Sequence, residues 1–178
     1  EAINHPQSST IRYLASLIAK ATNSKFGFVT EGANTMGACL TGITPHREMK
    51  GIPRSNFGLN TDAIKQCNSK LTLLWNSEPN ADVPNFADKK ENDASVIAFS
   101  SHFTDNFSNI ADLMLPIGTF AETSGTFINC EGSWQSFNGV SSPVHEARPG
   151  WKVLTVIGDL LKLDGFEFES SLDVLSEL

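Results

Sequence analysis

The sequence NIADLMLPIGTFAETSGTFINCEGSWQSFNG, residues 109–139, contains the features that decide the fold. Near its start, Leu113–Leu115 is a short apolar run closed by a proline, which is typical of a buried strand. Two strand-like runs, Thr126–Cys130 and Ser133–Phe137, follow, and the dipeptide Glu131-Gly132 separates them. A glycine at the second position of a two-residue loop suits a primed hairpin turn. The stretch therefore predicts one buried strand followed by a β-hairpin.

Three more apolar runs lie upstream and read as further strands: Phe26–Val29, Leu71–Trp75 and Val96–Phe99. The second run, LTLLW, is apolar throughout, and such a strand is expected to be covered on both faces, as in a parallel sheet. Together with Asp112–Leu115 these runs predict an α/β fold. We expect a Rossmann-like, largely parallel sheet of about four short strands, with flanking helices and an added β-hairpin.

Helical periodicity and capping residues predict the helices between the strands. The helix at Ser9–Ala21 is expected to bury one apolar face. Pro149 suits the first position of a later helix, whose apolar face consists of Trp151, Leu154, Ile157, Leu160 and Leu161. The predicted helices are Ser9–Ala21, a short helix capped by Thr61 or Asp62, a weak helix within Asn80–Asn92, a short helix or turn at Asp105–Ala111, a helix from Pro149 to about Leu163, and a last short helix at Ser171–Leu178. Residues 43–59 are predicted to form an irregular connection. We expect residues 1–165 to form one domain and residues 166–178 to be a linker or short helix.

Two glycine-containing segments could have special backbone roles. Gly32, Gly37 and Gly42 recur at intervals of five after the first predicted strand, and a glycine-rich turn there can offer backbone N–H groups to a phosphate. The spacing matches neither G-x-G-x-x-G nor a P-loop, because Ala38 stands where the P-loop lysine would be. Tight packing through small residues is the interpretation we favour. In the loop Glu122–Gly125, we expect the glycine to adopt a backbone conformation that other residues resist.

Composition limits the classes of partner. The net charge is −7 and the lysines and arginines are not clustered, which argues against nucleic acid. No apolar run approaches the roughly 20 residues of a membrane-spanning helix, so we expect no direct membrane insertion. The chain begins at Glu1 rather than at a methionine, and we interpret it as a piece of a longer protein.

The cysteines and histidines do not have the spacing of a metal site. The three cysteines, Cys39, Cys67 and Cys130, are too few for a four-thiolate iron–sulfur cluster and too far apart in sequence for a disulfide framework. The histidines, at positions 5, 46, 102 and 145, are scattered and show no zinc spacing. We therefore expect buried or free thiols and no metal ligands in this chain.

Polar residues follow two of the predicted strands, where ligands collect in open parallel sheets. Asn76–Pro79 comes after the second strand and Ser100–His102 after the third. A serine beside a histidine suggests a hydrolase, but AFSSH is not a nucleophile elbow, and triad members usually come from distant parts of a chain. We expect no catalytic residue here. His46 and Arg47 could grip an anion or serve as surface or interface contacts, and the sequence leaves both interpretations open.

Four motifs in one order carry a family resemblance. GANTMGACLTGITPHR at 32–47, ADLMLP at 111–116, ETSGTFINCEG at 122–132 and HEARPGWKVLTVIGDLL at 145–161 together resemble the molybdopterin-oxidoreductase domain, which is also found in formate dehydrogenases. They are most similar to the form of this domain in the large iron–sulfur subunit of respiratory complex I, the NADH-quinone oxidoreductase. The resemblance covers roughly residues 25–163.

The resemblance implies a non-catalytic structural domain. In the complex I subunit the pterin cofactor is generally absent, and the iron–sulfur clusters that carry electrons from NADH to quinone would lie outside this fragment. The implied partners are the remainder of the same subunit and other complex I subunits, at the cytoplasmic side of the inner membrane. The residues that match the family's pterin-binding loops would then be vestigial: Asn76, Glu78, Ser100, His102, Glu122 and Thr123.

The alternative that the resemblance allows is a pterin-dinucleotide-binding fragment of a true molybdopterin oxidoreductase. One departure from the family pattern weakens it. Family members often carry an arginine after the Glu-Gly of the hairpin, whereas this chain has Ser133. An arginine could bind an anion through its planar guanidinium group, and a serine cannot.

Overall fold

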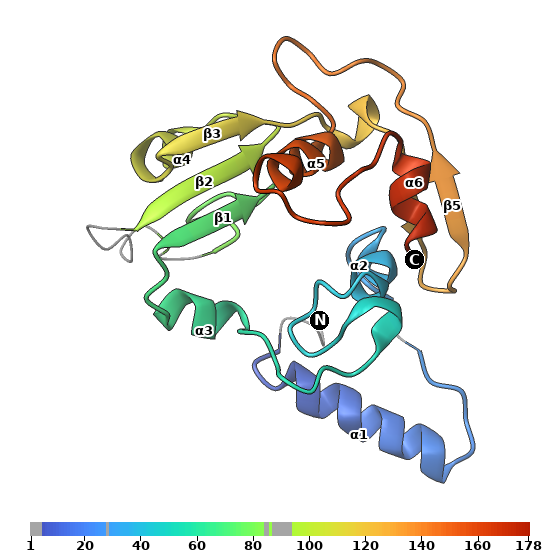
Figure 1. The fold of residues 1–178 in the computed structure, drawn as a ribbon. Helices are drawn as coiled ribbons and strands as arrows, with labels where there is room; N and C mark the ends of the chain where they lie inside the picture. The colour runs from blue at the N-terminus through green and yellow to red at the C-terminus, as the bar shows by residue number, and fades with distance from the viewer. Residues whose placement is uncertain (1–4, 28, 84–85, 87–93) are drawn as a thin grey trace.

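The computed structural model describes residues 5–27, 29–83, 86 and 94–178, and Figure 1 shows how their elements are arranged. In chain order the elements are α1 (Ser8–Ala21), α2 (Thr35–Leu40), the 3₁₀ helix η2 (Met49–Gly51), α3 (Thr61–Gln66), β1 (Leu71–Trp75), β2 (Ser95–Ser100), α4 (Asp105–Ile110), β3 (Leu113–Pro116), the 3₁₀ helix η4 (Phe120–Glu122), β4 (Gly125–Ile128), β5 (Trp134–Phe137), α5 (Gly150–Leu160) and α6 (Ser171–Ser176). The mixed α/β class predicted from the sequence is confirmed.

The sheet is parallel and has three strands in the order β1-β2-β3. Leu71 pairs with Ser95 at one end of β1, and Trp75 pairs with Phe99 at the other. Three of the predicted strands are thus confirmed to within one or two residues. The fourth, Phe26–Val29, is wrong for the residues that can be judged, because Phe26, Gly27 and Val29 have no strand geometry, and Phe28 lies outside the described residues.

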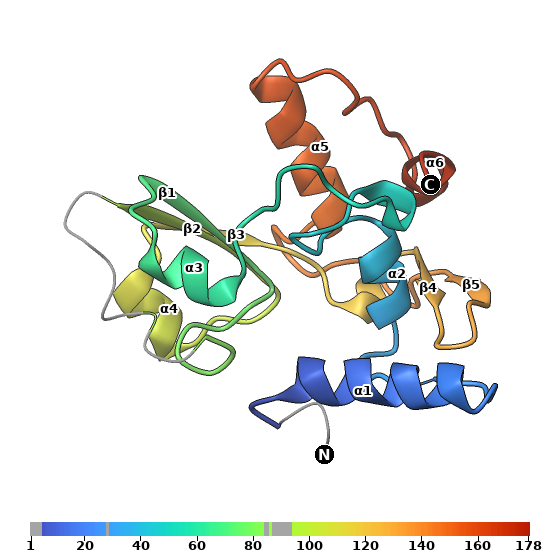
Figure 2. The same ribbon diagram turned by 90° about the horizontal axis from the view of Figure 1, so that it is seen from below.

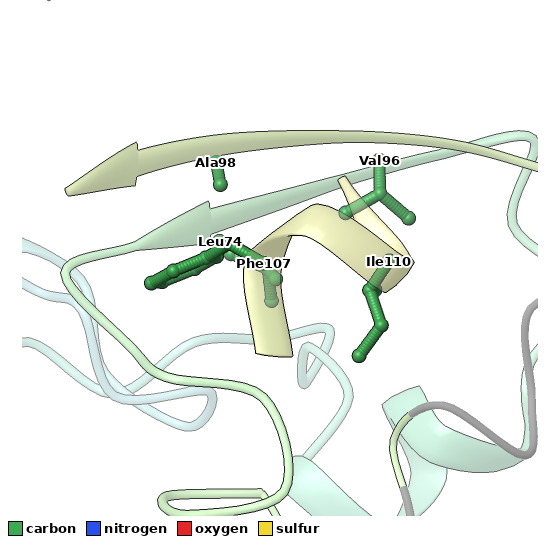
Figure 3. Packing of buried hydrophobic residues seen from close by; sticks show 5 residues of the cluster. All are labelled: Leu74, Val96, Ala98, Phe107 and Ile110. Atoms are coloured by element: carbon green, nitrogen blue, oxygen red, sulfur yellow. The ribbon is translucent and has the colours of Figure 1, made fainter. Parts of the chain in front are cut away.

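One face of the sheet carries the core. Leu74, Val96 and Ala98 point from the strands toward Phe107 and Ile110 of α4, as Figure 3 shows, and all five are at most 6% exposed. In Figure 2 both α3 and α4 lie on this side of the sheet. The register explains the choice of residues, since alternate positions of a strand share a face. Burial of these apolar side chains stabilises the packing of α4 against the sheet.

The opposite face of the sheet is largely open. Leu71, Leu73 and Leu113 share this face and are 50%, 56% and 49% exposed. The face is covered toward the ends of β1 and β2, where Gly150 at the start of α5 packs against the ring of Trp75 and the neighbouring Phe99 is 2% exposed. The expectation of cover on both faces is therefore wrong for this chain, although continuous apolar strands normally do receive it.

The β-hairpin has a different turn from the one predicted. The N–H of Asn129 donates to the carbonyl of Ser133 (3.2 Å), and the N–H of Gly132 donates to the carbonyl of Asn129 (3.0 Å). Gly132 has a φ of +84°, whereas Glu131 does not have positive φ. A primed two-residue turn of type I′ would need positive φ at both positions. The connection is instead a three-residue loop ending in a left-handed glycine.

Gly125 is needed for space rather than for an unusual φ, which corrects the expectation for this residue. It lies in β4 opposite Phe137, and a Cβ on it would come within 3.1 Å of the Phe137 ring. That ring also packs edge-to-face on Phe127, with 4.9 Å between the ring centroids. The glycine thus lets the aromatic pair close over the hairpin.

The glycines around α2 also act through close approach. A Cβ on Gly37 would overlap the side chain of Asn34, and Gly42, with a φ of +80°, lies against the backbone of Glu48 and Met49. This agrees with the tight packing favoured from the sequence, although the partners are a side chain and a loop rather than a second helix.

α2 was not predicted from the sequence. The other α-helices of the structure form near their predicted positions, but two of them bury less of their apolar surface than expected. α1 buries none of its residues, and Tyr13, Leu14, Leu17 and Ile18 are between 42% and 63% exposed. In α5, Leu160 and the following Leu161 are 74% and 64% exposed.

Several helix ends are also shifted from the predicted positions. α5 begins one residue later than expected, with Pro149 as its N-cap. α3 is capped by Asn60, whose side chain accepts from the N–H of Ala63, rather than by Thr61 or Asp62. The helix predicted within Asn80–Asn92 is not seen at residues 80–83, and most of its remainder lies outside the described residues.

The C-terminal segment packs against the rest of the chain. The hydroxyl groups of Ser124 and Ser171 are 2.7 Å apart, so that α6 contacts the start of β4. At the N-terminus of α6 the N–H of Asp173 donates to the Ser170 hydroxyl, and the N–H of Ser170 donates to the Asp173 carboxylate. Hydrogen bonds from Ser170 lower the pKa of Asp173 below its ordinary value of 3.8. Over the described residues, no helix has the length and apolar character needed to span a membrane.

Candidate functional site at the carboxyl ends of the parallel strands

The three parallel strands end at one edge of the sheet, and the loops that follow them form the candidate site. The first residue after β1, Asn76, has a φ of 45°, and its N–H donates to the carbonyl of Phe99 (2.7 Å). After β3, the N–H of Ile117 donates to the carbonyl of Ser100 (3.1 Å). These two bonds tie the loops after β1 and β3 to the end of the central strand.

The loop after β1 is held by its own acidic residues. The Asp82 carboxylate accepts a hydrogen bond from the N–H of Glu78 (2.6 Å). The Glu78 carboxylate in turn accepts from the side-chain amide of Asn106 (3.0 Å), which lies on α4. Both carboxylates are thereby engaged in positioning this loop against the helix.

The loop after β2 brings the predicted serine and histidine together. The Ser101 hydroxyl and Nδ1 of His102 are 2.8 Å apart, and the N–H of His102 donates to the buried Ser100 hydroxyl (3.2 Å). A hydrolytic triad also needs a group that orients the histidine from its other ring nitrogen. Within the described part of the chain, the hydrogen bond to Ser101 is the only one found for the His102 ring. The pair is thus a local contact without the third member of a triad.

In the loop after β3, the polar side chains form hydrogen bonds with other residues of the same loop. The Glu122 carboxylate accepts hydrogen bonds from the N–H (2.8 Å) and the hydroxyl (3.1 Å) of Thr119. The Thr123 hydroxyl donates to the carbonyl of Ser124 (3.2 Å). Glu122 and Thr123 therefore bind within their own loop, whereas Asn76, Glu78, Ser100 and His102 come together at the ends of β1 and β2.

The three loops share one property. After each strand, one backbone N–H that could bind an anion is occupied by a side-chain oxygen of this chain: Asp82 on Glu78, Ser100 on His102, and Glu122 on Thr119. Two of these three oxygens belong to carboxylates. Residues 76–79 and 100–105 also contain no lysine or arginine. A dinucleotide requires free N–H groups or cations for its phosphates, so these residues fit such a ligand poorly.

The other candidate residues have structural contacts. The guanidinium of Arg47 donates to the carbonyl of Gly51 (3.2 Å), and Arg54 donates through Nε to the carbonyl of Arg47 (2.7 Å). These bonds hold the irregular connection after α2 and favour a structural role for Arg47. Among the described residues, no group of three or more His, Cys, Asp or Glu side chains could hold a metal ion.

Sequence reasoning missed three residues that shape the site. Asp82 and Asn106 fix the loop after β1, and the ring of Trp75 packs at 5.1 Å from that of Phe99 beneath it. Asn106 lies next to the buried Phe107 on a short helix, and a polar residue in that position was a usable signal. The sequence offered no such signal for Asp82, because its hydrogen bond with the N–H of Glu78 depends on how the loop turns.

Comparisons with known proteins identify the family of the chain. The profile of the molybdopterin oxidoreductase family matches residues 1–160. The chain is 29% identical over 118 residues to the mitochondrial NADH-ubiquinone oxidoreductase 78 kDa subunit of Candida albicans, covering 65% of this chain and 15% of that protein. It is 32% identical over 119 residues to an NADH-quinone oxidoreductase subunit of Rickettsia typhi, covering 67% of this chain and 16% of that protein.

A nitrate reductase of Shewanella frigidimarina is also similar, at 24% identity over 119 residues, which cover 65% of this chain and 13% of that protein. The matched region thus amounts to about one-seventh of the length of these relatives. Since the family profile spans nearly the whole sequence, the chain belongs to the molybdopterin oxidoreductase family.

Proposed function

We propose that this chain is a non-catalytic structural domain of a large complex I subunit. The parent protein would pass electrons from NADH to quinone through iron–sulfur clusters that lie outside the 178 residues. The observation that carries the proposal is the occupation of one N–H group after each parallel strand by a side-chain oxygen of the chain itself. The similarity to complex I subunits supports the choice of parent.

The charge at the strand ends supports a structural role in preference to cofactor binding. Glu78 and Asp105 belong to the loops that would receive the phosphates of a pterin dinucleotide. Like charges in a partly desolvated site repel, and no basic residue within residues 76–79 or 100–105 offsets them. Asn76, Glu78, Ser100, His102, Glu122 and Thr123 would then be remnants of a binding edge, retained for the hydrogen bonds within and between their loops.

The uncovered apolar surfaces support packing as the task of the domain. Leu71, Leu73 and Leu113 leave one sheet face open, and α1 exposes the apolar residues along its length. A parallel sheet is normally covered on both faces. We propose that the remainder of the same subunit, together with other complex I subunits, covers these surfaces. The complex would hold the domain peripherally, at the cytoplasmic side of the inner membrane.

The proposed domain comprises residues 1–165, with residues 166–178 as an appended segment. That segment is attached through the Ser124–Ser171 contact and through Phe166, which packs on Gly158 of α5.

A second candidate function is a pterin-dinucleotide-binding fragment of a true molybdopterin oxidoreductase. The similarity to a nitrate reductase favours it. Against it stands Ser133, which follows the Glu-Gly of the hairpin and offers no cation to a phosphate.

Isothermal titration of the folded chain with molybdopterin guanine dinucleotide separates the two candidates. We expect no saturable heat at micromolar ligand, because one N–H group after each strand is already bonded and residues 76–79 and 100–105 contain no lysine or arginine. A one-to-one isotherm that disappears in both Asn76→Ala and Ser100→Ala would establish the second candidate instead. The matched control is Ser141→Ala, in the loop after β5, which should leave any such isotherm unchanged.

A further inference from the structure

The segment that leaves the hairpin contains the dipeptide Asn138-Gly139, which belongs to neither the core nor the candidate site. Asn138 is the only asparagine of the sequence that is followed by a glycine. It comes directly after β5, and Figures 1 and 2 both place this strand at the outside of the molecule. Both residues of the dipeptide are exposed and lie outside any helix or strand. Water therefore reaches an asparagine, a residue type that is chemically labile in proteins.

The atoms of this dipeptide that can react with each other have no competing contacts. Within the described part of the chain, neither the side-chain amide of Asn138 nor the N–H of Gly139 forms a hydrogen bond. Because glycine has no Cβ, nothing on Gly139 hinders the approach of its nitrogen to the preceding side chain. The next N–H, that of Val140, donates to the carbonyl of Ala121 (2.8 Å). The chain is thus anchored one residue beyond the pair, while the pair itself stays unbonded.

We propose that Asn138 is a site of spontaneous deamidation. The nitrogen of Gly139 gives its proton to water and forms a bond to Cγ of Asn138, and the bond between Cγ and the side-chain nitrogen breaks. That nitrogen takes a proton from water and leaves as ammonia, so that a succinimide ring remains. One water molecule then opens the ring and supplies the new carboxyl oxygen. The inference does not depend on the function proposed above.

The ring can open at either of its two carbonyl carbons. Cleavage of the bond from Cγ to the Gly139 nitrogen gives aspartate at position 138. Cleavage of the bond from the main-chain carbonyl carbon to the same nitrogen gives isoaspartate, whose main chain passes through the former side chain and is longer by a methylene. Both products carry a carboxyl group where the unmodified chain has a neutral amide.

The fold requires the glycine that makes this asparagine reactive. A Cβ on Gly139 would lie 3.1 Å from the nitrogen of Thr123 and 3.2 Å from the carbonyl carbon of Glu122. Both are backbone atoms, so they cannot move aside as the end of a flexible side chain can. A larger residue at position 139 would slow ring closure, but it would crowd the loop after β3. The structure therefore keeps the most reactive neighbour beside Asn138.

Isoaspartate at position 138 would alter the contact between the end of the hairpin and the loop after β3. The carbonyl of Ala121 accepts hydrogen bonds from the N–H groups of Val140 (2.8 Å) and Ser141 (3.4 Å). The added methylene changes the length of main chain between β5 and these two donors. We therefore expect isoaspartate to weaken this contact, and aspartate, which leaves the main chain unchanged, to weaken it less.

Peptide mapping by mass spectrometry of the folded chain tests the proposal. The chain is incubated at mildly alkaline pH in water labelled with heavy oxygen, because opening of the ring then places a labelled oxygen in the product. Conversion during later sample preparation lacks this label. We expect Asn138 to convert faster than Asn23, which serves as the internal comparison. Asn23 precedes a serine whose N–H donates to the carbonyl of Ala19 (2.8 Å), so its neighbouring nitrogen is engaged.

Two variants separate the effects of the reaction. Asn138→Gln should stay folded by circular dichroism and lose the conversion, because its longer side chain would have to close a larger ring. Asn138→Asp carries the charge of the products on an ordinary main chain. Converted chains collected by ion exchange contain isoaspartate as well, and they should melt at a lower temperature than Asn138→Asp.

Conversion at Asn138 that is no faster than at Asn23 would overturn the proposal. So would conversion that occurs only after the chain has been unfolded in urea, because the fold would then protect the pair. Converted chains that melt at the same temperature as Asn138→Asp would overturn the inferred effect on the contact with Ala121.

Discussion

The side chain of Asn34 accepts a hydrogen bond from the backbone N–H of Ile128 at 2.8 Å, across 94 residues of sequence. Ile128 is 2% exposed, so this N–H is shielded from water. The bond joins the start of α2 to the outer edge of β4. The glycine at position 37 makes it possible, since a Cβ there would overlap the Asn34 amide.

Replacing Asn34 with alanine should destabilise the chain by about 1–3 kcal/mol, because it leaves a buried N–H without an acceptor. The free energy of unfolding in urea measures the loss. Asn34→Asp keeps an acceptor oxygen and should cost less than the alanine variant. Equal stability of the alanine variant and the unmodified chain would show that another group takes over the N–H.

Replacing Gly132 with valine should cost about 1–3 kcal/mol, because a β-branched residue tolerates its φ of +84° poorly. No atom lies within 4 Å of a Cβ at this position, so backbone strain is the only cause. Gly132→Asn is the control and should cost less, since asparagine tolerates left-handed φ. A urea midpoint that is identical in all three proteins would contradict the three-residue loop.

Adjacent leucines of β1 should respond in opposite ways. Replacing Leu74, which is 6% exposed in the core, with alanine should lower the free energy of unfolding by about 2–5 kcal/mol. Leu73, which is 56% exposed on the open face, should change stability by no more than about 0.5 kcal/mol. Thermal melts of the two alanine variants make the comparison.

If the open face packs against the remainder of the subunit, Leu73→Asp should impair assembly of the complete subunit while the isolated chain stays folded. Co-purification of the chain with the rest of that subunit tests this. Unimpaired assembly of the aspartate variant would place the subunit contact elsewhere.

Gly158 and Phe166 should show strong coupling in a double-mutant cycle. Gly158→Ala should destabilise the chain, because its Cβ would overlap the Phe166 side chain. In a Phe166→Ala background the same change should cost less, because the overlap with the ring is gone, although the Cβ of residue 166 would still lie 2.7 Å from the added Cβ. Urea unfolding of the four proteins gives the coupling energy. Additive effects would mean that Phe166 does not rest on Gly158.

The strands of the sheet could be predicted because each contains a short continuous apolar run, whereas the segment of α4 was predicted only as a short helix or turn. Phe26–Val29 has a similar apolar composition, yet a strand also needs the edge of a sheet to join, and the described residues of this run belong to neither sheet. The run of apolar residues in β1 indicates that both faces of the strand favour burial. It does not report whether the covering element belongs to the same 178 residues.

The candidate site was predictable in position but not in detail. The rule that ligands collect at carboxyl strand ends located the loops after β1 and β2. It could not indicate that Asp82 would turn back onto the N–H of Glu78, because that bond depends on the positive φ of residues such as Asn76 and Asn80. The contact of Asn34 with Ile128 was equally hidden, since sequence periodicity carries no information about pairs 94 residues apart.

The order of the three parallel strands follows the order of the sequence, and this has a consequence for synthesis on the ribosome. All of the residues that form the sheet and its core lie between Leu71 and Pro116. Chains emerge at about 5–20 residues per second, and folding begins with the parts that are released first. The sheet can therefore close before the hairpin has been made. Asn34, by contrast, cannot accept its hydrogen bond until Ile128 has been synthesised, so this contact forms after the residues of the sheet have been made.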